Sequence, residues 1–341
     1  MTAFNKRPVF IVGSPRSGTT LLHHMLLSSG DFAIYRTESG VFSILAPRFG
    51  DLSVRRNREE LMEHWLRSDL FVLSGLDAET IRARILNECR SAGDFVRITM
   101  ESMAAQQGVS RWLEDSPWDV LQMDAIKQQV PGALVVHIIR DGRDVAMSLV
   151  KQGWVRAFPW EKGNALVASA VFWEWLVLQG RADSARIAPD YLEIHYEDLV
   201  ENPQPTLDKL GAFIDHKLDY EQIKRVGIGS VSRPNTSFSG SKTFAKRWKQ
   251  QLPAADLLTL EETIGGTLGE LGYELENPEL AAHPGTGAVL RRKMYRAHFG
   301  LKQWAKMNTP LSRFLVNLDI LKPGSIVGAE RSIAWPGARA R

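Results

Sequence analysis

The chain has 341 residues, of which 44% are hydrophobic and 24% charged, and it carries a net charge of +3. This composition is typical of a globular protein that buries a sizeable core, and the charge is too small to indicate a nucleic-acid partner. Cys89 is the single cysteine, which excludes an internal disulfide. No apolar run approaches the roughly 18 residues of a membrane-spanning helix, and residues 1–8 do not resemble a signal peptide. We therefore expect a cytoplasmic location.

The chain opens with a strand, a glycine-bounded loop and a helix. Val9 to Val12 is a short, continuous, mostly β-branched run, which is typical of a buried parallel strand. Thr19 to Ser28 places its apolar residues on one helical face. The loop between them is Gly13-Ser14-Pro15-Arg16-Ser17-Gly18-Thr19-Thr20. This order predicts the first half of a β-α-β unit with a phosphate-binding loop.

The residues of this loop restrict the class of ligand that it can bind. Glycines let backbone N–H groups converge on an anion, and the following helix adds its positive N-terminal end. A nucleotide triphosphatase would carry Lys at the position of Thr19 to reach the outer phosphates. Here the cation is Arg16, inside the loop. The loop therefore favours one 5′-phosphate with one further charged group, without a metal, although a βα turn that binds nothing has the same spacing.

The same pattern recurs at residues 133–148. Residues 133–139 predict a buried strand, Arg140 follows at its end, and Asp144 stands where a helix N-cap belongs. Arg140 is placed for a ligand because open α/β sheets bind ligands at strand ends. We expect Arg143 to tie the turn together by pairing with Asp141 or Asp144.

The remaining segments complete a fold class. Residues 191–196 predict a third strand, and helices are expected at 57–70, 77–90, 165–178, 204–214 and 260–271. Strands that alternate with helices predict an α/β protein with a P-loop-type parallel sheet flanked by helices, helical insertions and a helical C-terminal tail. We expect one domain over residues 1–280, with a helical insertion at about 40–115, and a basic extension over 281–341.

The segment Pro15-Arg16-Ser17-Gly18-Thr19-Thr20-Leu21-Leu22 resembles the 5′-phosphosulfate loop of sulfotransferases that use 3′-phosphoadenosine 5′-phosphosulfate (PAPS). The branch with tyrosylprotein sulfotransferases and many bacterial enzymes is the most similar. The resemblance implies transfer of the PAPS sulfonyl group to an acceptor hydroxyl without a metal. It also implies that PAPS contacts Arg16, Ser17, Gly18, Thr19 and Thr20.

Other motifs of the resembling family fall on later residues. By resemblance, Arg140 and Ser148 hold the 3′-phosphate, whose recognition separates PAPS from nucleotides that lack it. Tyr196 matches a tyrosine near the adenine, and a core tyrosine is the competing interpretation. Ser232 and Arg247 match the C-terminal nucleotide contacts.

The resemblance assigns the chemistry to Glu38 as general base, with Arg16 steadying the transferring charge. An exposed acidic loop residue is the alternative for Glu38. His23 and His24 are alternative bases, although a surface or half-buried helical position is expected for each. Many relatives carry a Lys between Trp and Pro before the second strand, where this chain has Asp115. Arg16, Arg36 or Arg247 then supplies the missing charge, or Asp115 orients one of them.

The acceptor stays open: a small molecule, lipid, carbohydrate or peptide with a hydroxyl. Residues 40–115 and the tail beyond 280 are expected to shape its site. The tail has seven Lys and Arg residues and no acid between Leu290 and Val316. It can pack as a basic helix, contact an anionic membrane, close a lid or join an oligomer. Two rival functions remain, a P-loop nucleotide kinase and a non-catalytic nucleotide-binding protein.

Overall fold

A four-stranded parallel sheet organises the chain, in a computed structural model that describes residues 6–161, 163–229, 245–324 and 326. The strand order is β2-β1-β3-β4, with β1 paired to β2 and β3. The strands are β1 (Val9–Gly13), β2 (Leu113–Asp115), β3 (Leu134–Ile139) and β4 (Tyr191–His195). After β1, the chain adds β2 on one side of β1 and then β3 on the other side. The carboxyl ends of β1 and β3 therefore form a switch point, where sheets of this kind bind ligands.

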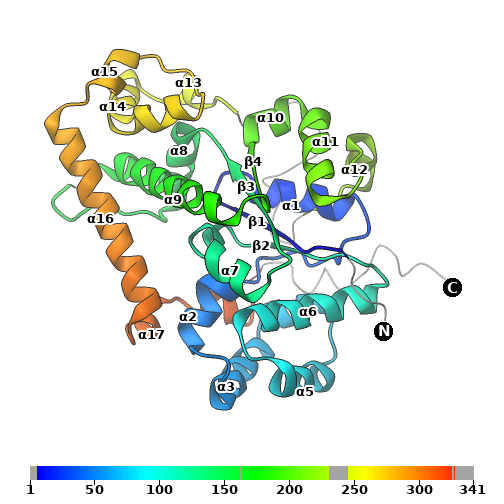
Figure 1. Ribbon diagram of the computed structural model, residues 1–341. Helices are drawn as coiled ribbons and strands as arrows, with labels where there is room; N and C mark the ends of the chain where they lie inside the picture. The colour runs from blue at the N-terminus through cyan, green and yellow to red at the C-terminus, as the bar shows by residue number, and fades with distance from the viewer. Residues whose placement is uncertain (1–5, 162, 230–244, 325, 327–341) are drawn as a thin grey trace.

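Helices cover both faces of the sheet (Figure 1). Val12 and Val135 pack on one face against α7 (Met123–Gln129), α8 (Gly142–Gln152), α9 (Ala165–Ile187) and α14 (Ala254–Glu270). Val9 and Ile11 pack on the other against α1 (Thr19–Ser28), α10 (Tyr196–Glu201), α11 (Pro203–Ile214) and α12 (Tyr220–Val226). Because both faces are covered, the strands are apolar along their length, as the sequence predicts.

A helical insertion builds a third core that packs on Phe10 of β1. Phe10 packs there with Phe42 and Trp112 at ring-centroid distances of 6.2 and 5.8 Å. The elements are a π-helical turn η1 (Val41–Leu45), α2 (Ala46–Phe49), α3 (Arg55–Trp65), α4 (Asp69–Ser74), α5 (Ala78–Glu88), α6 (Ala92–Gln107) and a 3-10 turn η2 (Pro117–Leu121).

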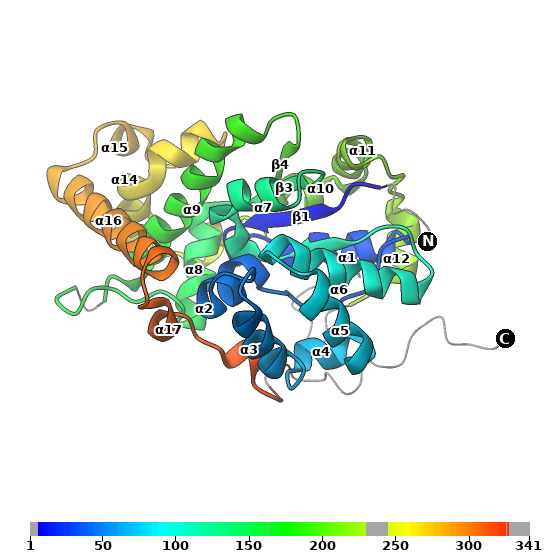
Figure 2. The same cartoon turned by 60° about the horizontal axis from the view of Figure 1, so that its bottom comes forward.

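The C-terminal part runs along the outside of this body. It consists of α13 (Trp248–Gln251), α15 (Pro278–Ala282), α16 (Thr286–Asn308), α17 (Ser312–Leu315) and the turn η3 (Asp319–Leu321). In Figure 1, α16 descends from the α14–α15 unit toward α2, and α17, at its end, packs beside α2 (Figures 1 and 2). No helix among the described residues is long and apolar enough to cross a membrane.

The predicted fold class is confirmed, and two local predictions need correction. The strand β2 was not predicted, because three residues are too few for a pattern of alternation or continuous apolarity to stand out. The N-cap of α8 is Asp141 and not Asp144, since the Asp141 side chain accepts from the backbone N–H of Arg143. Asp144 lies in the first turn, where its carboxylate is used by other groups.

Candidate active site

The loop after β1 has the geometry of an anion cradle. Arg16 and Gly18 adopt positive φ angles of 74° and 100°, and the N–H of Ser17 bonds the carbonyl of Ser14 at 3.1 Å. Gly18 caps α1 without a side-chain hydrogen bond, so no side chain competes for the N-terminal amides of that helix. The Ser17 side chain is fully buried and its hydroxyl has no hydrogen-bond partner among the described residues. These features fit a bound phosphate.

Gly18 is required by a close approach as well as by its backbone angle. A Cβ atom at this position would lie 2.4 Å from Cδ2 of Tyr196, which is too close for two carbon atoms. Tyr196 begins α10 and is 5% exposed, with its ring against the loop. The Arg140 guanidinium lies over the same ring, 4.6 Å from its centroid. Tyr196 therefore packs against both predicted nucleotide motifs, through Gly18 of the first and Arg140 of the second.

The two predicted nucleotide motifs converge at the ends of β1 and β3. Arg140 donates to the backbone carbonyl of Arg16 at 3.2 Å and to the carboxylate of Asp144 at 3.3 Å. Arg16 in turn donates from Nε to the hydroxyl of Ser148 at 2.9 Å. Residues separated by more than 120 positions in the sequence thus form one continuous polar group.

Arg247 reaches this region through a buried network. It precedes α13, and the next residue, Trp248, donates its backbone N–H to Asp144 at 2.9 Å. Arg143 stacks on the Trp248 ring at 3.5 Å and pairs with Asp141 at 2.8 Å, which confirms its expected role in the turn. Burial raises the pKa of Tyr196, and the positive charges of Arg140 and, more weakly, Arg247 oppose the rise. Ser232, the other predicted contact, lies outside the described residues.

Glu38 lies beside these groups in a loop that a buried acid holds in place. Glu114 accepts hydrogen bonds from the backbone N–H of Ser39 at 3.1 Å and from the hydroxyls of Ser39 and Ser116. Burial, together with the charge of Glu114, raises the pKa of Glu38 to about 7, while Arg16 opposes the rise. A carboxyl group with this pKa can accept a proton near neutral pH.

Three further acids surround Glu38. Glu114, Asp115 and Asp119 are each at most 3% exposed. Burial raises the pKa of all three, and the charge of Glu38 contributes to the rise for Asp115 and Asp119. A hydrogen bond from the Thr19 hydroxyl lowers the pKa of Asp115 in part. Thr19 is thus turned toward Asp115. No group of three or more His, Cys, Asp or Glu side chains in the described part of the chain is arranged to hold a metal ion.

The two histidines of α1 are buried, contrary to the surface or half-buried positions expected from the sequence. His23 and His24 are 2% and 1% exposed and stack with ring centroids 5.3 Å apart. Burial lowers both pKa values, that of His24 to about 4. His23 lies 3.6 Å from the carboxylate of Asp115. Both imidazole rings therefore favour the neutral form, with His23 next to the carboxylate of Asp115.

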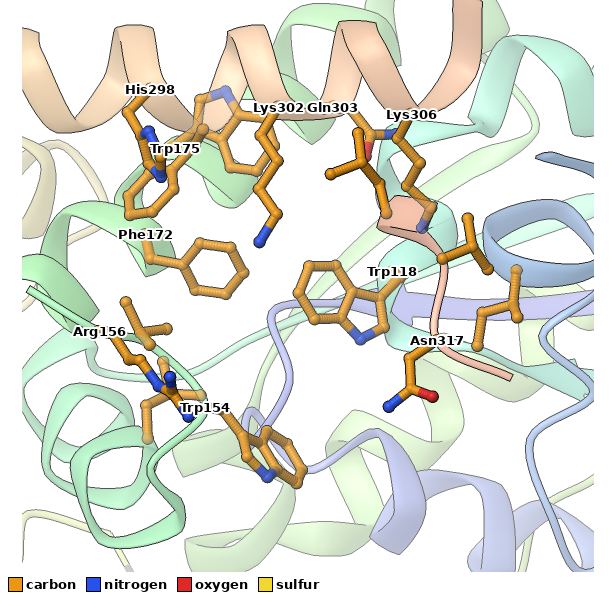
Figure 3. A pocket seen from close by; sticks show the side chains of 16 residues that line it. Trp118, Trp154, Arg156, Phe172, Trp175, His298, Lys302, Gln303, Lys306 and Asn317 are labelled. Atoms are coloured by element: carbon orange, nitrogen blue, oxygen red, sulfur yellow. The ribbon is translucent and has the colours of Figure 1, made fainter. Parts of the chain in front are cut away.

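A pocket of about 540 Å³ opens next to these groups (Figure 3). Its wall includes Trp118, Phe172, Trp175 and Phe299. It meets the nucleotide motifs at Trp154, whose ring lies 5.8 Å from the Arg16 guanidinium. The pocket draws mainly on α8, α9, α16 and their connections, and only Ile44 among its lining residues comes from the 40–115 insertion. The tail thus contributes to a candidate acceptor site more than the insertion does.

Sequence reasoning missed the roles of Glu114, Ser116 and Asp119. Glu114 lies within β2 and Ser116 and Asp119 follow it, and the carboxyl end of β2 lies at the same edge of the sheet as the loop after β1. Two adjacent acids before a proline are unusual at the end of a buried segment. This pattern could have indicated functional residues in the run Leu113-Glu114-Asp115-Ser116-Pro117. Without the pairing of β2 with β1, nothing placed them near Glu38.

Comparison with known proteins identifies the family of the chain. The model of the sulfotransferase family matches residues 8–220, more than half of the chain. Protein-tyrosine sulfotransferase A from Caenorhabditis elegans is 22% identical over 312 residues, which cover 87% of this chain and 75% of that protein.

Among solved structures, the sulfotransferase domain from the curacin biosynthetic pathway is 20% identical with a TM-score of 0.50. The match covers 78% of this chain and 98% of that domain. The sulfotransferase domain of the Synechococcus PCC 7002 olefin synthase is 19% identical with a TM-score of 0.47, over 87% of this chain and 95% of that domain. The first of these similarities supports the fold, and the match to the family model over residues 8–220 shows that the chain belongs to the sulfotransferase family, whose members transfer sulfonyl groups.

Proposed function

We propose that the chain is a PAPS-dependent O-sulfotransferase with Glu38 as its general base. The observation that carries the proposal is the convergence of Arg16, Arg140 and Ser148 around an uncapped helix N-terminus beside Glu38. The amides at the start of α1 and the buried Ser17 hydroxyl suit a 5′-phosphosulfate. Arg140 and Ser148 suit the 3′-phosphate, with Tyr196, Arg247 and Ser232 completing the nucleotide site.

The proposed reaction is an in-line displacement at sulfur. The acceptor oxygen forms a bond to sulfur as the bond from sulfur to the phosphate oxygen breaks, and 3′-phosphoadenosine 5′-phosphate (PAP) leaves. Glu38 takes the proton of the acceptor hydroxyl, for which its pKa of about 7 is suited. Negative charge on the transferring group and on the leaving phosphate faces Arg16 and the α1 amides.

We propose that Arg16 supplies the positive charge that many relatives obtain from a Lys at the position of Asp115. It lies in the loop after β1, contacts Ser148 at 2.9 Å, and its charge opposes the rise in the pKa of Glu38. Asp115 occupies the position of that Lys, is buried, and meets Thr19 and His23. We assign Asp115 to orienting the start of α1, with no direct role in neutralising the sulfonate.

Two variants test the proposal with labelled PAPS and calorimetry. Glu38→Gln should bind PAP normally and lose at least about 100-fold in transfer, the usual contribution of a general base. Arg140→Ala should weaken PAP binding by about 2–5 kcal/mol, the range for removing one partner of a buried charge pair. Normal turnover by Glu38→Gln would contradict the base assignment. Unchanged PAP binding by Arg140→Ala would contradict the site for the 3′-phosphate.

The same experiment decides the alternatives. Membership of the sulfotransferase family removes the nucleotide kinase from consideration. A non-catalytic nucleotide-binding protein would bind PAP and transfer nothing to any fraction of a cell extract supplied as acceptor. The division at residue 280, the absence of a metal and the cytoplasmic location stay predictions.

We also propose that the outer face of α16 contacts an anionic membrane surface. Leu290, Leu301 and Trp304 are 60%, 66% and 57% exposed and recur at helical spacing. Phe314 of α17 is 86% exposed. Because Lys293 and other cations flank this apolar stripe, the helix has the pattern of an interfacial segment.

A further inference from the structure

The candidate acceptor pocket combines an apolar wall with cations and has no acid in its lining. Trp118 and Phe172 form two sides, and Lys302 extends from α16 into the space between them (Figure 3). Arg156 projects from the opposite side, next to Trp154. No Asp or Glu side chain is among the lining residues. The lining thus offers apolar surface and positive charge to one occupant.

Two cations of the pocket, Lys302 and Arg156, are not used for ion pairs within the described part of the chain. Arg291 and Arg292, which belong to the same helix as Lys302, pair with Glu161 and Glu174 at 3.0 and 2.6 Å. Lys302 and Arg156 form no salt bridge with any residue that the structure describes. A positive charge in a recess without a fixed partner attracts an anion, because apolar walls focus its field.

A third cation of the lining, Lys306, has a different environment. Burial lowers its pKa, and the charge of the buried Asp119 acts in the opposite direction. Lys306 thus has the buried Asp119 as an electrostatic partner. Lys302 and Arg156 are the more exposed cations of the lining.

We infer that the acceptor is an anionic amphiphile: a molecule with an apolar, ring-sized body, a hydroxyl to be sulfonated and an acidic group bound by Lys302 and Arg156. The inference rests on the proposed function, because it names the substrate class of that same site. The aromatic wall binds the body, and a pocket of this volume accommodates a molecule of drug-like size. The hydroxyl then points past Trp154 and Arg16 toward Glu38.

We assign the acidic group to the acceptor and not to the nucleotide, because the two cations come from other segments than the phosphate loops and line the aromatic pocket. Arg156 belongs to the connection between α8 and α9, and Lys302 to α16, whereas the loops after β1 and β3 hold the nucleotide motifs. Both cations are exposed at the pocket, so their attraction for an anion is modest and weakens with salt.

A matched pair of probes tests the inference by calorimetry on the full chain with saturating PAP. The probes are 6-hydroxy-2-naphthoate and 6-hydroxy-2-naphthamide, which share ring and hydroxyl and differ in charge. We expect the naphthoate to bind at least about fivefold more tightly at low salt, as two exposed charge pairs allow. The preference should disappear in the double variant Lys302→Met/Arg156→Met. It should persist in Lys293→Met, which removes a cation of the same helix outside the pocket.

Each other result overturns the inference. Equal affinity for both probes, no binding of either, or a preference that survives the double variant would do so. Loss of PAP affinity in the double variant would assign the cations to the nucleotide instead. Arg140→Ala separates the two proposals: weaker PAP binding with the naphthoate preference intact supports both. Unchanged PAP affinity refutes the nucleotide site and leaves the pocket result standing.

Discussion

Glu38 shows at the scale of one residue how the catalytic role that we propose for it conflicts with stability. Its carboxyl group lies among three buried acids, and its pKa of about 7 is above the ordinary value of 4.5. A carboxyl group whose pKa is raised on folding stabilises the folded state only while it is protonated. That contribution is complete below pH 4.5 and is lost as the pH rises through 7.

Glu38→Gln should therefore be more stable than the parent protein at pH 8, by roughly 1–3 kcal/mol. The difference should be much smaller at pH 5, because the carboxyl group of Glu38 is then protonated in the folded protein. Urea unfolding at the two pH values measures it, and other titrating groups cancel in the comparison. An identical difference at both pH values would show that Glu38 is not perturbed.

The same pKa sets the pH dependence of the reaction. In the proposed reaction the carboxylate form of Glu38 accepts the proton, so kcat should rise with pH through an acid limb at about 7 or above. The limb should lie on the upper side because the negative charge of bound PAPS raises the pKa further. Rates under saturating PAPS between pH 5.5 and 9 test this, and a limb near pH 4.5 would contradict it.

At the scale of elements, a buried charge network ties α8 to α13 and α14. Arg143 is 1% exposed and pairs with Asp141 and with Glu261, whose carboxylate lies 2.6 Å away. Glu261 also accepts from the backbone N–H groups of Glu276 and Asn277. Trp248 stacks under Arg143, which fixes the segment that carries Arg247.

Arg143→Met should cost about 3–5 kcal/mol of stability, since it leaves two buried carboxylates without their shared cation. PAP binding should weaken as well, because α13 loses its support. Arg55→Met provides the control, as its pair with Glu59 is exposed and should contribute less than about 1 kcal/mol. Equal effects of the two variants would show that the network contributes no special stability.

Elements with a strong local signal were the ones that the sequence predicted. The strands β1, β3 and β4 and the buried helix α9 follow from runs of apolar residues. The role of β2 could not be predicted because its pairing with β1 is a tertiary contact. For the same reason His23 and His24 were expected nearer the surface. Their burial depends on elements that enter the fold much later in the chain.

At the scale of the whole molecule, α16 belongs to the same structure as the sheet. Arg292 pairs with Glu174, which is fully buried in α9, and the Tyr295 hydroxyl donates to Glu161 at 2.8 Å. Tyr295 is itself fully buried and stacks with Phe158 at 4.3 Å. One face of α16 is thus fixed to the body, which determines the face that remains outside.

That outer face should bind anionic vesicles. Flotation with vesicles of phosphatidylserine and phosphatidylcholine should carry the protein upward, whereas phosphatidylcholine alone should carry much less, because the lysines and arginines of α16 require an anionic surface. Leu301→Glu/Trp304→Glu should abolish flotation, since two charges would enter the apolar stripe. Leu258→Glu, at a 43% exposed leucine of α14, should float like the parent chain.

Flotation must also respond to salt if α16 acts as proposed. Attraction between exposed cations and anionic headgroups weakens at ionic strengths where the screening length falls to a few ångströms, about 3 Å at 1 M. Flotation should therefore decline as salt rises from 0.05 to about 1 M, while the double glutamate variant stays unbound throughout. Flotation of that variant at low salt would show that another surface carries the contact. The outer face of α16 would then simply be exposed to solvent.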